Sequence, residues 1–554
     1  MTTLQFIFLI IVTSISGIGA ASEEFQTHHP IISATLVGIA LGDVTTGVMV
    51  GAAVELIALG WMTVGAASPP DPALAGTVAA VLAILGHVNV GVAVGIAIPV
   101  AVAGQLLQIV QLSTIEVAIV HLGDKFAREG NTRGIGFAHW LTAVPSALRV
   151  ALPTALVACF ASASFAQNMF NGIPKVITGG LQVTAGFLVV VGYAMVLKQI
   201  NRKDILPFFF IGFLIMTFSH DMTLIALSIV GICFAVIYYL FLDKSAANAG
   251  GRKVRSRDGA AAPEASISDA SQSASPVAES AVDDGKKLTK SDLMKVFLRT
   301  QFYQVSWTYE RFQNLCYCYC MVPILKRLYP EKEELSTALT RHMEYFNTNP
   351  IMASPVLGVN AAMEESMVHG SGITEEAITS TKVALMGPFA GIGDSVFWGI
   401  LRPMFAAIAA GIASQGNLMG PIFFFLAFNI IRVFVRYYGL ILPYKQGTSF
   451  ISMFHGGEQK FVKAISVLAY TVIGGLVARW TTINIPVQLY SFVVSGKTVT
   501  TTIQDQLNAI MPNLLPLALT FFVYWLLKKK VKPTYIIFGL MFVGVAGYAL
   551  GILG

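Results

Sequence analysis

Long apolar segments recur along the whole chain, and they constrain its fold more than any other feature. Many reach the roughly 20 apolar residues that a helix needs to cross a bilayer, for example 4–21, 90–110 and 535–553. Only 12% of the residues are charged, whereas soluble domains carry about a quarter. We therefore predict an all-α membrane protein that crosses the bilayer many times. The high glycine and proline content indicates closely packed and interrupted helices.

A change of composition divides the chain into two membrane halves. Residues 243–287 are rich in Ala, Ser, Gly, Pro and charged residues and contain no aromatic residue. Such a segment cannot bury a core, so we predict a flexible linker, and its four basic residues at 252–257 place it in the cytoplasm. The predicted membrane domains are 1–242 and 288–554. The net charge of +6 does not indicate nucleic-acid binding, because the basic residues gather in loops.

Several local expectations follow from the pattern of polar residues. The run 1–22 has no Lys or Arg before it, which favours a first membrane helix over a cleaved signal peptide. Residues 121–133 read as a polar loop, and 206–242 as a hairpin that turns near 220–221. The segment 288–345 carries charges every few residues, which predicts amphipathic helices at the membrane surface.

The stretch LMGPFAGIGDSVFWGILRP (385–403) places charges inside an apolar run. Helical spacing puts Asp394, Trp398 and Arg402 on one face. The glycines and Pro388 weaken a continuous helix, and a broken helix at membrane depth is tolerated only beside protein or a polar cavity. This pattern predicts a site for a polar solute. The alternative is that Asp394 only caps a helix that starts after Gly393.

Other polar residues also interrupt apolar runs. Glu55 lies near the middle of 47–67, where a carboxylate at bilayer depth costs about 2.5 kcal/mol or more. It is a functional candidate unless a re-entrant element brings it to water, and Asp71 flanks the same run. Gln105, Gln108 and Gln111 recur at a spacing of three. These amides suit recognition of hydroxyl groups or, equally, hydrogen bonding between helices.

The sequence lacks the common motifs of nucleotide-binding proteins and hydrolases. It contains no P-loop, dinucleotide fingerprint, HExxH or GxSxG. Cys316, Cys318 and Cys320 have CxCxC spacing, but no second ligand cluster follows, so we expect packing residues and neither metal nor cofactor. Isolated acids, amides and indoles in apolar segments instead indicate a transporter for a small polar solute.

Motifs of both halves resemble one transport system. EFQTHHPIISATLVGIALGD (24–43), ELIALGWMTVGAASPPDPALA (55–75) and GYAMVL (192–197) closely resemble the C subunit of the mannose-family sugar phosphotransferase system. Its D subunit is similar to this chain at VFLRTQFYQVSWTYERFQ (296–313), RLYPE (327–331), FNTNP (346–350), the 385–403 stretch and RYYG (436–439). The two subunits are usually separate chains, whereas here they are joined through 243–287.

This resemblance implies a fold and a mechanism. The two halves would share a similar, inversely oriented fold with broken or re-entrant helices, assemble as a homotrimer in the bacterial cytoplasmic membrane, and move as an elevator. A hexose would bind between them. A cytoplasmic A/B component, phosphorylated on histidine from phosphoenolpyruvate through enzyme I and HPr, would phosphorylate the sugar on release. The chain would thus be a permease and not itself an enzyme.

The resemblance and the polarity at depth together nominate the sugar-binding residues. Carboxylates would accept hydrogen bonds from hydroxyls, amides would donate and accept, and Trp307 would pack on the ring. The nominated residues are Glu55, Asp71, Gln105, Gln304, Trp307, Asn347, Asn349, Glu364 and Asp394. An ion-coupled secondary transporter is the alternative, in which Glu55 and Asp394 would carry a proton or Na⁺. The sequence does not choose among mannose, glucose, amino sugars, fructose and sorbose.

Overall fold

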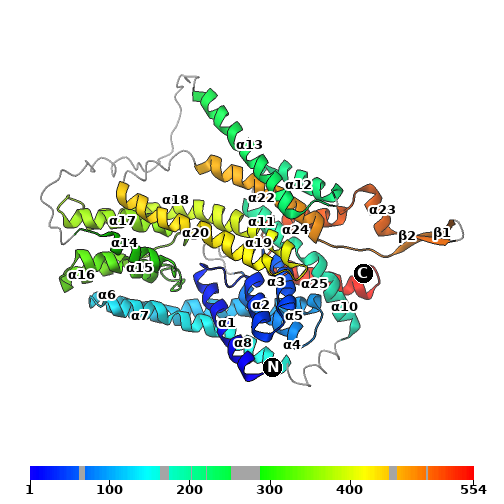
Figure 1. The fold of residues 1–554 in the computed structure, drawn as a ribbon, viewed down its shortest axis with the longest axis horizontal. Coiled ribbons are helices and arrows are strands. Elements are labelled where there is room, and N and C mark those ends of the chain that lie inside the picture. The colour runs from blue at the N-terminus through cyan, green and yellow to red at the C-terminus, as the bar shows by residue number, and fades with distance from the viewer. Residues whose placement is uncertain are drawn as a thin grey trace.

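The structure is a computed structural model, and it is mostly helical (Figure 1). It describes residues 1–61, 69–161, 174–200, 202–219, 221–250, 287–447, 458–494 and 497–554.

The first half of the chain forms the α-helices α1 (Thr3–Ser22), α2 (Pro30–Leu41), α3 (Val44–Ala58), α4 (Pro72–Leu85), α5 (Val90–Val110), α6 (Glu116–Arg128), α7 (Thr132–Leu141), α8 (Ala143–Ala161), α10 (Lys175–Leu188), α11 (Val190–Ile200), α12 (Leu206–Phe218) and α13 (Leu224–Gly250), with the π-helix η1 (Gln111–Ile115) between α5 and α6.

The second half forms α14 (Lys290–Thr300), α15 (Asn314–Leu328), α16 (Lys332–His342), α17 (Ala353–Val368), α18 (Glu375–Gly393), the π-helix η4 (Asp394–Leu401), α19 (Arg402–Ala413), α20 (Met419–Gln446), α22 (Glu458–Trp480), β1 (Gln488–Val494), β2 (Lys497–Thr502), α23 (Ile503–Ile510), α24 (Leu514–Lys528) and α25 (Pro533–Ala549).

The predicted polytopic membrane character is confirmed. Among the described residues, seven helical runs are long and apolar enough to cross a membrane, and the bent pair α23–α24 would make an eighth. Large apolar side chains such as Ile7, Phe160 and Phe434 are exposed on these helices. A soluble protein would bury such a surface, whereas a bilayer solvates it.

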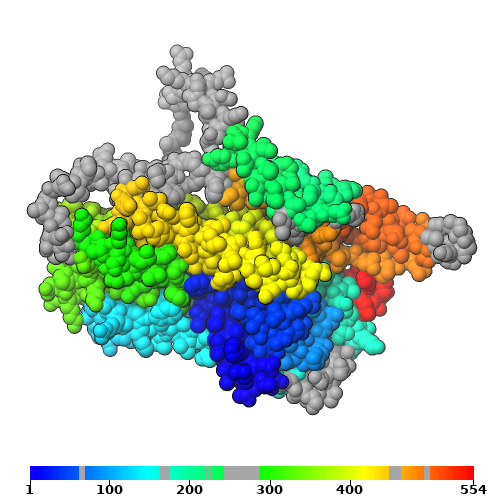
Figure 2. All heavy atoms as spheres, viewed as in Figure 1, coloured from blue at the N-terminus to red at the C-terminus, as the bar shows by residue number. Residues whose placement is uncertain are grey.

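The two halves of the chain are interleaved rather than stacked as separate bodies. Helix α12 packs along α22, α10 along α25, and α19 against α3. In Figure 2, the blue spheres of the first helices lie directly against the yellow spheres of α19 and α20. Glycines permit the closest approaches, because a Cβ on Gly212 would collide with the backbone of Thr471, and one on Gly474 with that of Phe209. One hydrophobic core therefore combines residues from both sides of the linker.

A second hydrophobic core also draws on both halves. The α6–α7 hairpin of the first half contacts α16 and α15 of the second, and Figure 1 shows the hairpin running along these helices. Helix α15 is buried almost throughout, since α7, α14, α16 and α17 cover it. The prediction of surface helices over 288–345 is therefore wrong for α15.

Three further local predictions need correction. Residues 121–133 are not a loop but the end of α6 and the start of α7, joined by a short turn in which Gly130 has a φ of 63°. Helix α13 continues beyond 242 to Gly250, so the first residues of the predicted linker are helical, and 251–286 lie outside the described residues. The antiparallel hairpin β1–β2 makes the fold not strictly all-α.

The 385–403 stretch does not break its helix. Helix α18 passes directly into η4 and then α19, as one run from 375 to 413. Asp394 has right-handed helical geometry and is preceded by helix, so it does not cap a new one. Pro388 and the glycines before Asp394 lie within α18, and the π segment, in which hydrogen bonds reach five residues instead of four, begins only after them. The hairpin predicted at 206–242 is confirmed as α12 and α13, with residue 220 outside the described set.

Candidate functional site

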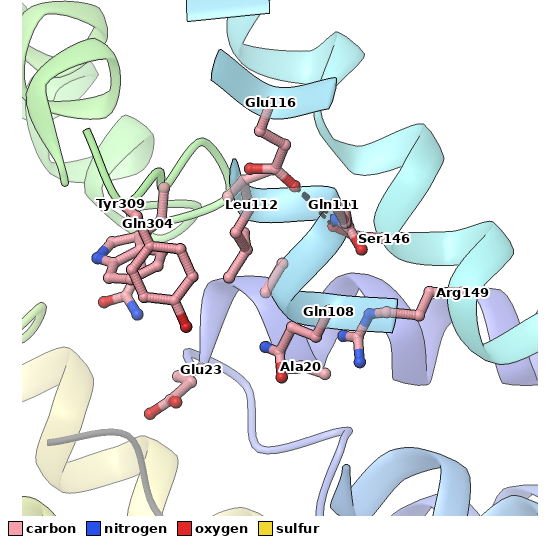
Figure 3. A pocket seen from close by; sticks show the side chains of 13 residues that line it. Ala20, Glu23, Gln108, Gln111, Leu112, Glu116, Ser146, Arg149, Gln304 and Tyr309 are labelled. Atoms are coloured by element: carbon pink, nitrogen blue, oxygen red, sulfur yellow. Dashed lines mark hydrogen bonds between the residues drawn. The ribbon is translucent and has the colours of Figure 1, made fainter. Parts of the chain in front are cut away.

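A polar cavity lies where the two halves of the chain meet (Figure 3). Its walls come from the end of α1, from α5, η1, α6 and α8, and from the segment 301–313 that joins α14 to α15. The lining residues are Ala20, Ala21, Glu23, Gln108, Gln111, Leu112, Glu116, Ser146, Arg149, Gln304, Val305, Trp307 and Tyr309.

The cavity is shallow and narrow in this conformation. It encloses about 440 Å³ of empty space, open solvent included, and its enclosed part has room for about one water molecule. A ligand of hexose size would therefore need the walls to separate.

The π-helix η1 builds one polar wall. In an α-helix, residues five apart lie about 140° around the axis from each other, but a π turn brings them together. Gln111 and Glu116 thus share one face, and the Gln111 amide donates hydrogen bonds to the Glu116 carboxylate and, at 2.8 Å, to Ser146 Oγ of α8. Figure 3 shows this cluster above Gln108.

Asp71 reaches the cavity through a partner. The carboxylate caps α4 by accepting the Leu74 backbone N–H at 3.1 Å. Its other oxygen accepts a hydrogen bond from Arg149, which lines the cavity. Both side chains are buried. The predicted residue Asp71 therefore orients a guanidinium that lines the cavity.

The segment 301–313 forms the opposite wall. Gln304 has a φ of 67°, a left-handed conformation that non-glycine residues seldom adopt. The side chain of Gln313 holds it by donating to Gln304 Oε1 at 3.3 Å and to the Thr348 carbonyl at 2.7 Å. Helix α7 adds a bond between His139 and Ser306 at 2.8 Å. The predicted residues Gln304 and Trp307 line this wall.

Three other nominated residues form buried pairs that do not line the cavity. Glu55 on α3 contacts His29 Nδ1 at 2.6 Å and accepts the Ile31 backbone N–H at 3.1 Å. The Asn349 amide donates to Asp394 at 2.9 Å, at the point where η4 begins. These contacts bring the FNTNP and 385–403 motifs together.

Two further nominated residues, both amides, are half-buried and lie outside the cavity lining. Asn347 is half-buried in the same FNTNP segment as Asn349, and Gln105 is half-buried on α5, one turn before Gln108. Neither lines the cavity, whereas Gln108 and Gln111 of the same predicted amide stripe do.

Glu364 lies in a separate, fully paired ion cluster. Its Oε1 accepts from Arg341 and from His342 at 2.8 Å, and its Oε2 accepts from Tyr329 at 2.6 Å and again from Arg341. Burial alone would raise the pKa of this carboxyl, but the hydrogen bond and charge of His342 and the charge of Arg341 outweigh it and lower the pKa to about 2. Both oxygens are already engaged by protein donors.

The sequence reasoning missed several lining residues. Glu116 is the only Asp, Glu, Lys or Arg in 90–120, and Arg149 is the only one in 134–161, which is the same signal that singles out Glu55. Glu23, which directly follows α1, is buried and pairs with Arg402 at 3.2 Å. Among the described residues, no group of three or more His, Cys, Asp or Glu side chains could hold a metal ion.

Comparison with known proteins assigns the two halves. The sequence model of the "PTS system sorbose-specific iic component" matches residues 3–237, and that of the "PTS system mannose/fructose/sorbose family IID component" matches 287–553. The "PTS system mannose-specific EIID component" of Escherichia coli K12 is 48% identical over 272 residues, which are 49% of this chain and 96% of that relative. The chain belongs to the mannose/fructose/sorbose permease family of the phosphotransferase system.

Other relatives agree with this family assignment. The mannose-specific EIIC component of the same strain is 45% identical over 238 residues, which are 43% of this chain and 89% of that relative. A solved structure titled "Structure of membrane protein" is 48% identical, covers 49% of this chain and 100% of its own, and has a TM-score of 0.47.

Membership of the family gives the chain a permease role. It fuses a IIC and a IID component in one polypeptide, translocates sugar as part of the phosphotransferase system, and is a multi-pass protein of the bacterial inner membrane. Phosphoryl transfer is carried out by the cytoplasmic A and B partners of such permeases. The comparisons do not favour the alternative of an ion-coupled transporter.

Proposed function

We propose that this permease binds a hexose of the mannose type in the cavity between its two halves and delivers it to a phosphorylated A/B component. The main observation in support of this proposal is that both halves supply polar walls to one cavity. Gln111 and Arg149 of the first half lie across it from Gln304 of the second half (Figure 3), and Glu116 and Trp307 also line it. Amides and charges can satisfy hydroxyl groups, while an indole ring can pack on the apolar face of a sugar.

The nominated residues take different roles in this proposal. Gln304 and Trp307 contact the sugar directly, and Asp71 acts by orienting Arg149. Asp394 and Glu55 join the site when the walls separate, and Glu55 then exchanges its contact with His29 or with the Ile31 backbone N–H for one with the sugar. Because its oxygens are all engaged, Glu364 has a structural role.

An elevator motion of one helix group past another would open the narrow cavity. Each half contains a continuous helical run of 39 residues with an internal π segment, Val90–Arg128 and Glu375–Ala413. This likeness supports two halves of similar fold, which an inverted arrangement requires. We propose a homotrimer as the assembled form, to be checked by measuring the mass of the purified complex in detergent.

Uptake into proteoliposomes tests the proposed function. The purified chain is reconstituted with labelled mannose on the outer face, and the A/B component, enzyme I, HPr and phosphoenolpyruvate are enclosed on the cytoplasmic face. Sugar phosphate should accumulate only when all components are present, and fructose and sorbose competition should rank the substrates. Accumulation of free sugar that an uncoupler abolishes would overturn the proposal in favour of ion coupling.

A further inference from the structure

One buried acid on the cavity wall is left out of the roles assigned above. Glu116 directly follows η1, its side chain is fully buried, and it lines the cavity together with Gln111 and Ser146. Among the nominated acids, none lines this wall.

The hydrogen bonds of Glu116 are only half satisfied. Its Oε1 accepts the Gln111 amide and Ser146 Oγ, the latter at 3.4 Å. Its Oε2 has no hydrogen-bond partner of good geometry, although the backbone amide of Trp307 lies close enough to interact with the carboxyl group. In Figure 3, this second oxygen points away from Gln111, toward the side of the cavity that holds Gln304 and Tyr309.

Two neighbouring buried polar atoms also lack a hydrogen-bond partner. Gln111 Oε1 and Arg149 Nε are also buried on the cavity lining without a hydrogen-bond partner. Each unmatched buried polar atom costs about 1–3 kcal/mol unless a ligand or water completes it. The wall thus offers two acceptors and one donor. Two acceptors call for a ligand that presents hydrogen-bond donors, and hydroxyl groups provide them.

We propose that Glu116 is a specificity-determining residue, whose Oε2 accepts a hydrogen bond from one hydroxyl of the sugar while the Gln111 carbonyl oxygen accepts from a second. The inference rests on the proposed sugar site and deepens it. The π turn is essential to this arrangement, because it places Gln111 and Glu116 on one face and commits Oε1 to the protein. Oε2 is thereby left free for the ligand.

Monodeoxy sugars test the inference directly. Mannose and its analogues deoxygenated at each position in turn compete for labelled mannose uptake in the wild type and in Glu116→Met. A buried acceptor that loses its donor predicts that one analogue binds roughly 10–100-fold more weakly than mannose to the wild type. In Glu116→Met this ratio should fall below about threefold for that analogue, while the ratios at the other positions stay unchanged.

Two further variants serve as controls for this experiment. Glu129→Gln, an exposed position just after α6, should keep every ratio of the wild type. If Glu116→Met does not fold, Glu116→Gln preserves the shape and should reduce the same ratio, because its amide oxygen must stay on the Gln111 amide and its NH₂ group then replaces the free acceptor.

The outcomes separate this inference from the proposed function. If the wild type takes up no mannose even with the full phosphotransfer chain, the proposed function fails. If it does, and the Glu116 variants keep the wild-type ratio at every position, the acid binds only water or protein and this inference is overturned.

Discussion

The Arg402 guanidinium and the Glu23 carboxylate form a buried ion pair at 3.2 Å, although the two residues belong to opposite halves of the chain. Arg402 also stacks over the Trp398 ring, with the Cζ atom 4.4 Å from its centroid. The next acid, Glu24, is held in the same way by Arg432 and Arg436. The segment between α1 and α2 is therefore clamped by arginines of the second half.

Loss of Arg402 should destabilise the contact between the halves. Arg402→Gln leaves Glu23 as an unpaired buried charge, which typically costs about 3–5 kcal/mol. We expect a lower midpoint in thermal unfolding of the purified protein in detergent. Arg133→Gln, at an exposed arginine, is the control and should unfold like the wild type. An unchanged midpoint for Arg402→Gln would show that the ion pair contributes no net stability.

Exchange of Asn349 and Asp394 separates packing from function. In the double variant Asn349→Asp/Asp394→Asn, the new amide at 394 can donate to the new carboxylate at 349, so the hydrogen bond survives with its direction reversed. The carboxylate at 349 would also still accept the Ile351 backbone N–H. Because we place Asp394 in the sugar path, sugar uptake by the double variant should be low compared with the wild type. Its thermal stability should equal that of the wild type, because the hydrogen bond is kept. Restored uptake would show that only the pair is required.

Glu364 should matter for stability rather than for the affinity for sugar. Glu364→Leu leaves His342 without its acceptor and Arg341 with Glu375 as its remaining ion-pair partner, with an expected loss of about 3–5 kcal/mol. The low pKa of the carboxyl means that it is ionised in the folded state, so its stabilising effect is complete at neutral pH and would be lost only as the pH falls from about 4.5 towards 2. Protein that still folds should keep the wild-type KM, and a raised KM would return Glu364 to the sugar site.

The membrane fold was predictable because its signals are local. Apolar length gave the spans, and the compositional break gave the two halves. The interleaving of α12 with α22 was not accessible, since it depends on glycines more than 250 positions apart meeting face to face. Motif resemblance nominated Gln304 and Trp307, which line the cavity.

Other parts of the site could not be predicted from helical periodicity. An α-helix with 3.6 residues per turn would place Gln111 and Glu116 on different faces, whereas the π turn of η1 places them on the same face. Nor does a buried acid show its partner in the sequence. Glu364 and Glu116 looked alike as isolated carboxylates, yet the first is fully paired and the second is not. That difference decides which of them can bind a ligand, and only the tertiary contacts reveal it.

Replacement of Glu55 by Gln should leave the local structure intact. In Glu55→Gln, the amide oxygen can still accept the Ile31 backbone N–H, and the NH₂ group can donate to His29 Nδ1 if the imidazole moves its proton to Nε2. His29 Nε2 has no partner to oppose this change of tautomer. The thermal midpoint and the assembly state should thus stay within the range of the wild type.

Sugar uptake by Glu55→Gln should nevertheless be abolished, because the site would lack the carboxyl acceptor that we assign to a sugar hydroxyl. Phosphoenolpyruvate-dependent mannose uptake in proteoliposomes measures this, and Glu129→Gln is again the control. A stable Glu55→Gln with wild-type uptake would remove Glu55 from the sugar path. Glu55 would then be a packing residue that only joins α2 to α3.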